Sequence, residues 1–61
     1  MVIKGKTDEG QDIVFDISKA IAVEAGTRGY SYVRTANTNA LTIAEPSYES
    51  LADSFYAANK D

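Results

Sequence analysis

The sequence predicts an α+β domain, in which a curled antiparallel β-meander of four to five strands carries one C-terminal helix. Apolar and polar residues alternate over most of residues 2–44, which is the period of half-buried strands. Glycine and asparagine interrupt this alternation at short intervals, and the period becomes that of an amphipathic helix after Pro46. The 61 residues leave room for one small core, so we expect a single domain over residues 1–61.

The first two predicted strands, residues 2–7 and 12–17, form a hairpin. Gly10 lies in the turn between them and can adopt the positive φ that tight turns need. The second strand alternates in polarity, with Ile13, Phe15 and Ile17 on one side and Asp12, Val14 and Asp16 on the other. This pattern predicts a strand with one side buried and the other in solvent.

Three further strands are predicted at residues 21–25, 30–35 and 40–44. Two glycines, at positions 26 and 29, mark the first turn between them, and residues 37–39 (Asn-Thr-Asn) mark the second. The side chains expected to face the core are Ile21, Val23, Leu41 and Ile43. Pro46 has no N–H to donate to a neighbouring strand, so the sheet should end before it.

A C-terminal helix is predicted over residues 47–59. Its apolar positions recur at helical spacing: Tyr48, Leu51, Ala52, Phe55 and Ala58. Ser47 is suited to the N-cap, and Glu49 lies in the first turn, where the helix dipole favours a negative charge. Because such an apolar stripe must be covered, we expect the helix to pack on one face of the sheet.

The composition excludes several kinds of chemistry. The chain has no cysteine and no histidine, so disulfides are excluded and a zinc site is not expected. The acidic residues around Gly10 lack the spacing of a calcium-binding loop, and residues 26–29 lack the lysine of a phosphate-binding loop. So small a chain also leaves little room for a deep pocket. We therefore expect no enzymatic activity, no metal and no cofactor.

The charge distribution favours some partners over others. Six basic and nine acidic residues give a net charge of −3, which disfavours binding to duplex DNA. Charges cancel over residues 1–35, so the negative excess lies in residues 36–61. Neither a signal peptide nor a stretch long enough to cross a membrane is visible. We expect no membrane association and a cytoplasmic location, in a bacterial cell or in the host cell of a virus.

Two surfaces are candidate binding sites. If Val33 is buried, strand alternation places Arg28, Tyr30, Tyr32 and Arg34 together on the opposite, exposed face. Tyrosine and arginine are enriched at protein interfaces, and tyrosine also stacks on bases. The same residues are equally suited to covering the sheet, with the arginines extending to water.

The second candidate surface is one flank of the predicted helix. Glu49 and Asp53 are four residues apart, and Tyr56 and Lys60 follow on the same flank. This flank is either a solubilising face or an acidic docking strip for a basic partner.

These observations favour a small non-enzymatic protein-interaction module that acts as a stoichiometric regulator or inhibitor of another protein. Self-association is expected as well, because small domains without disulfides or metals often need a partner chain. One alternative is a nucleotide or small-ligand sponge, with sites formed between subunits by Arg28, Tyr30, Tyr32 and Arg34. Another alternative is binding of single-stranded nucleic acid by the same side chains.

Two segments resemble the small flagellar-operon proteins of the FlbD and SwrD type. Residues 21–24 (Ile-Ala-Val-Glu) resemble the isoleucine-rich middle strand of that family. Residues 43–51 resemble its valine-x-glutamate-serine entry to the helix. The resemblance implies curled antiparallel strands that lead into a C-terminal helix, and a non-catalytic accessory role in a motility machine.

Overall fold

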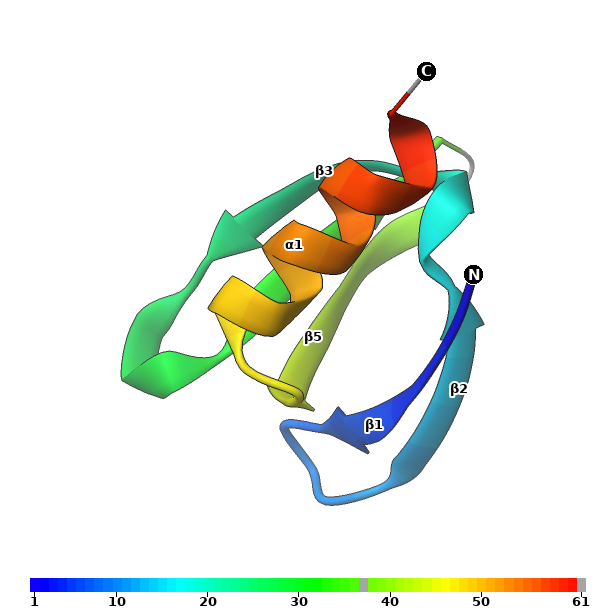
Figure 1. Ribbon diagram of the computed structural model, residues 1–61. Coiled ribbons are helices and arrows are strands. Elements are labelled where there is room, and N and C mark those ends of the chain that lie inside the picture. Colours follow the sequence, from blue (N-terminus) through cyan, green and yellow to red (C-terminus); the bar gives the residue numbers. More distant parts are fainter. Residues whose placement is uncertain (37, 61) are drawn as a thin grey trace.

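The computed structural model describes residues 1–36 and 38–60, with the backbone alone at position 38. These ranges form five strands, β1 (Val2–Thr7), β2 (Asp12–Asp16), β3 (Ala20–Ala25), β4 (Ser31–Thr35) and β5 (Thr38–Glu45), and one α-helix, α1 (Tyr48–Asn59). Two short 3₁₀ turns, η1 (Ile17–Lys19) and η2 (Thr27–Gly29), precede β3 and β4. The predicted α+β fold, a curled antiparallel sheet with one C-terminal helix, is confirmed (Figure 1).

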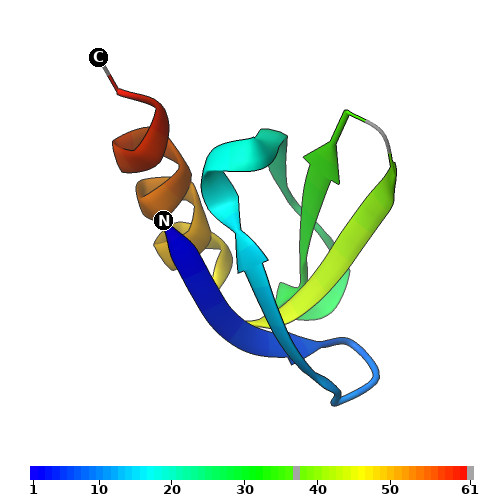
Figure 2. The same ribbon diagram turned by 90° about the vertical axis from the view of Figure 1, so that its right-hand side faces the viewer.

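The strands form one antiparallel sheet in the order β2-β1-β5-β4-β3. β1 and β5 pair through only two residue couples, Lys6 with Glu45 and Thr7 with Ile43, and the register shifts between them. A bulged junction this short lets the sheet bend sharply. The β1–β2 hairpin therefore folds away from the β3–β4–β5 layer, and η1 bridges the two parts (Figure 2).

The hydrophobic core lies between the curled sheet and the helix. Its fully buried members are Ile17, Val33, Ile43 and Leu51. Partly buried side chains surround them: Ile3, Ile13, Phe15, Val23, Leu41, Phe55 and Ala58. α1 contacts β3 and η1, and the Ser47 hydroxyl caps it by accepting a hydrogen bond from the Ser50 N–H at 3.3 Å. The expected N-cap and the packing of the helix on the sheet are both confirmed.

Ile21 was expected in the core, and this expectation is wrong, since its side chain is 63% exposed. Ala20 pairs with Thr35 and Ala22 with Arg34, so two steps along β3 match one step along β4. Ile21 is the extra residue of this bulge. Strict alternation therefore fails there, and the side chain leaves the core.

Four other local expectations need correction. Tyr48, expected on the buried stripe, is exposed because it is the first residue of α1 and lies at the end of the packed segment. Ile17 begins η1 and does not end β2, although it is buried as expected. Tyr30, expected to begin the fourth strand, precedes β4, which begins at Ser31. Positions 38 and 39, expected in a turn at residues 37–39, belong to β5, which starts at Thr38; Asn37 lies outside the described residues.

Candidate functional site

The four residues of the first candidate surface lie on two different elements of the fold. Ser31 and Val33 are fully buried, so Tyr32 and Arg34 lie on the outer face of β4, as strand alternation predicted. Arg28 lies in η2, where it has a left-handed φ of 56°. Tyr30 is the residue that ends this turn. The expectation of a continuous four-residue strand face is therefore wrong for Arg28 and Tyr30, which lie outside the strand.

Both outer-face residues of β4 make contacts within the sheet. The Arg34 Nε donates to the Glu24 carboxylate on β3 at 3.0 Å, which pairs its charge across the two strands. The Tyr32 ring lies over Gly26, where a β-carbon would come within 3.0 Å of the ring atoms. Part of this surface thus stabilises the β3–β4 pair, in keeping with the alternative that these residues cover the sheet.

The second candidate surface is the acidic helix flank, formed by Glu49, Asp53 and Tyr56. All three side chains are exposed, because the opposite side of α1 buries Leu51 against the sheet. Tyr56 is 69% exposed, more than any other exposed large hydrophobic residue of the structure. Among the residues that the structure describes, none forms a hydrogen bond or an ion pair with these three side chains. The flank is therefore free to contact another molecule.

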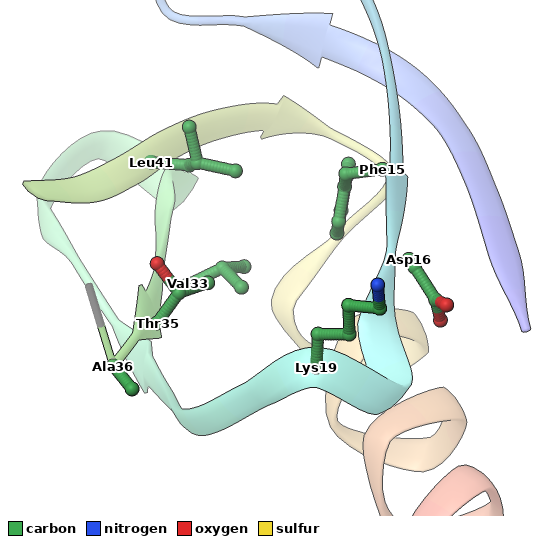
Figure 3. Close-up of a pocket in the computed structure, with 7 residues that line it drawn as sticks. All are labelled: Phe15, Asp16, Lys19, Val33, Thr35, Ala36 and Leu41. Atoms are coloured by element: carbon green, nitrogen blue, oxygen red, sulfur yellow. The ribbon is translucent and has the colours of Figure 1, made fainter. Parts of the chain in front are cut away.

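A cavity of about 390 Å³ lies between the two layers of the curled sheet. Its wall is formed by Phe15, Asp16, Lys19, Val33, Thr35, Ala36 and Leu41. Phe15 extends from β2 on one side, and Val33 and Leu41 face it from β4 and β5 (Figure 3). A pocket of this size was not expected in so small a chain. The two layers separate where β1 and β5 stop pairing. No local sequence pattern predicts the space between them.

The two charged residues of the cavity wall differ in their surroundings. Asp16 Oδ1 accepts hydrogen bonds from the Ser18 hydroxyl at 2.6 Å and from the Ser18 N–H at 3.0 Å. The terminal ammonium of Met1 lies 3.2 Å from the same oxygen. These donors, Ser18 first, lower the pKa of Asp16 to about 2. Lys19 has no ion-pair partner within the described ranges, and its side chain runs along the cavity (Figure 3).

The outer face of β1 carries Lys4 and Lys6. Both are exposed, but the Lys6 ammonium lies 2.6 Å from the Asp12 carboxylate on β2. This hydrogen bond and the charge of Asp12 raise the pKa of Lys6 and lower that of Asp12. Lys6 is thus engaged within the hairpin, and Lys4 opposes Val14 across the strands.

Over residues 1–36 and 38–60, no group of three or more acidic side chains is arranged to hold a metal ion. No helix in these ranges is long and apolar enough to cross a membrane. Compared with family models, with curated proteins and with solved structures, the chain has no match.

Proposed function

We propose that this protein is a non-enzymatic protein-interaction module that docks a basic partner on its acidic helix flank. The observation that carries the proposal is the exposure of Tyr56 beside the unpaired carboxylates of Glu49 and Asp53. An aromatic ring on the surface supplies contact area, and nearby carboxylates attract and orient a positively charged surface. The negative excess of residues 36–61 adds a long-range contribution of the same sign.

The helix flank supports this function better than the tyrosine and arginine surface of the sheet does. Arg34 already has a carboxylate partner, and Tyr32 is half-buried over Gly26. A ligand at the sheet would have to compete with these contacts, whereas a ligand at the helix would displace only water. A phosphate-bearing ligand, such as a nucleotide or single-stranded nucleic acid, would be repelled by the acidic flank.

Docking through one helix flank suits a stoichiometric regulator or inhibitor, because such a protein needs a surface and no reaction centre. An accessory role in a motility machine, which the flagellar resemblance implies, would use the same kind of contact. The remainder of the molecule is then a scaffold that holds α1 rigid and presents one of its sides.

The experiment compares two double variants of the tagged protein in a cell lysate. Asp53→Asn with Tyr56→Ala alters the helix flank, and Tyr32→Ala with Arg34→Ala alters the sheet surface; Glu9→Gln, which removes one negative charge at an exposed position in the turn between β1 and β2, is the control. We expect the wild type and the control to retain a partner that is released near 1 M salt, where charges are screened within about 3 Å. We also expect the helix variant to lose it. Retention by the helix variant together with loss by the sheet variant would contradict the proposed docking site.

Self-association is a second part of the proposal. Val2 and Val14 are exposed on the outer face of the β1–β2 hairpin, where Val2 pairs with Asp16 and the next pair on that face is Lys4 with Val14; the two valines offer an apolar surface to a second copy. Light scattering of the purified protein should give a mass above the 6.6 kDa of one chain. Val14→Lys should then reduce the mass to that of one chain. A wild-type protein that stays monomeric at millimolar concentration would refute this part alone.

A further inference from the structure

We infer that the cavity between the sheet layers is a binding site for a small amphipathic carboxylate, with its apolar chain against Phe15 and its anionic group beside Lys19. The site goes beyond the proposed docking function and shares no residue with the acidic helix flank. Its existence rests on three properties of the cavity: its size, its apolar wall and its single unpaired charge.

The size suits a small molecule. At about 390 Å³, the cavity falls within the range of roughly 300 to 1,000 Å³ that is usual for ligand pockets. With a volume of about 30 Å³ for each water-sized group, it has room for roughly a dozen such groups. A medium-chain carboxylate such as octanoate, with about ten non-hydrogen atoms, fits this volume.

The wall of the cavity favours the hydrocarbon chain of a ligand. Phe15, Val33 and Leu41 face one another across the space, and Ala36 adds to the wall at its edge (Figure 3). Val33 is fully buried and supports the wall from within, so a ligand would contact mainly Phe15 and Leu41, which are partly buried, and Ala36, which is exposed. Water next to such a surface is readily displaced by a hydrocarbon chain. The apolar wall alone would accept any small hydrophobic molecule.

The two charged residues of the cavity wall favour a ligand with a negatively charged head group. Asp16 is satisfied by Ser18 and by the terminal ammonium, and Figure 3 shows its carboxylate directed away from Phe15. Lys19 is the other charged residue of the wall, and no described residue pairs with it. Its ammonium therefore contributes an uncompensated positive charge at one end of an apolar space. An amphiphile with one negative head group complements this arrangement.

The test is a titration of the isotope-labelled protein with hexanoate, octanoate and the uncharged 1-octanol, followed by heteronuclear NMR. Octanoate should shift the amide signals of Phe15, Val33 and Leu41. Two added methylene groups should make octanoate bind up to about fifteenfold more tightly than hexanoate. Lys19→Gln should weaken octanoate binding about threefold to fivefold at low salt and leave 1-octanol unaffected, since exposed charge pairs contribute modestly.

Lys60→Gln is the matched control, because it removes the same charge at an exposed position at the end of α1. Thermal unfolding of each variant establishes that the fold is retained. The inference is overturned if octanoate shifts none of the three cavity signals, if hexanoate and octanoate bind equally, or if the two lysine variants weaken octanoate binding to the same extent. None of these results depends on whether the acidic helix flank binds a protein.

Discussion

Replacement of Gly5 by alanine should be among the most damaging small changes to this protein. Gly5 lies in β1 next to the end of β5, where the two sheet layers meet. A β-carbon added there would overlap the Glu45 carbonyl group and approach the Pro46 Cδ to 2.9 Å. The overlapping atoms belong to the backbone and to a proline ring, which cannot turn aside as a flexible side chain would.

The expected cost follows from this contact. An extra methyl group in a filled site typically costs about 1 to 3 kcal/mol, and here the strain falls on the short junction between β1 and β5. We therefore expect Gly5→Ala to lose about 3 kcal/mol or more of unfolding free energy. A domain of 61 residues has only about 3 to 9 kcal/mol in total, so a large unfolded fraction should appear.

Urea denaturation followed by circular dichroism measures the effect, with Gly10→Ala as the matched control. Gly10 has a φ of +82° and no atom within 4 Å of an added β-carbon. Its substitution should therefore cost only the strain of the left-handed backbone, about 1 to 2 kcal/mol. In an unobstructed strand, alanine is preferred over glycine by about 0.5 to 1 kcal/mol. A Gly5→Ala protein as stable as the wild type, or more stable, would refute the close crossing of the two strands.

Three further predictions concern stability, and urea denaturation checks each of them. Leu51→Ala should cost about 2 to 5 kcal/mol, because Leu51 is fully buried between α1 and the sheet; a loss below about 1 kcal/mol would contradict this packing. Ser31→Ala should leave stability unchanged or raise it by about 1 kcal/mol, because the buried Ser31 hydroxyl has no hydrogen-bond partner among the described residues; a clear loss would reveal a hidden partner. The folded-state pKa of Asp16 is lowered from 3.8 to about 2, so its contribution to stability should be present above about pH 4 and disappear as the pH falls toward 2. Asp16→Asn should remove this part of the acid sensitivity, and an unchanged pH profile would argue against the Ser18 hydrogen bonds.

The local pattern of apolar and polar residues was sufficient to predict most of the fold. The alternation at residues 12–17 correctly placed Phe15 toward the interior and Val14 in solvent. The change of period after Pro46 correctly located a helix whose buried side includes Leu51. These predictions succeeded because the side-chain direction in a regular strand or helix depends on near neighbours in the chain, whatever the element packs against.

The candidate sites were predicted less completely. Exposure of Glu49, Asp53 and Tyr56 followed from helical periodicity and was confirmed. The pairing of Arg34 with Glu24 could not be foreseen, because it depends on the register between β3 and β4. The same register contains the bulge that exposes Ile21, and a single inserted residue leaves no mark in the hydrophobic pattern.

The amino-acid sequence by itself determined the class of fold, the absence of thiol and imidazole chemistry, and the faces that each regular element turns to solvent. Only the tertiary structure decided the order β2-β1-β5-β4-β3, the crossing at Gly5 and the cavity beside Lys19. The physical reason is distance along the chain. The thirty residues 8–37 separate β1 from β5 in the sequence, and the space between two layers depends on how they join and not on the pattern of either one.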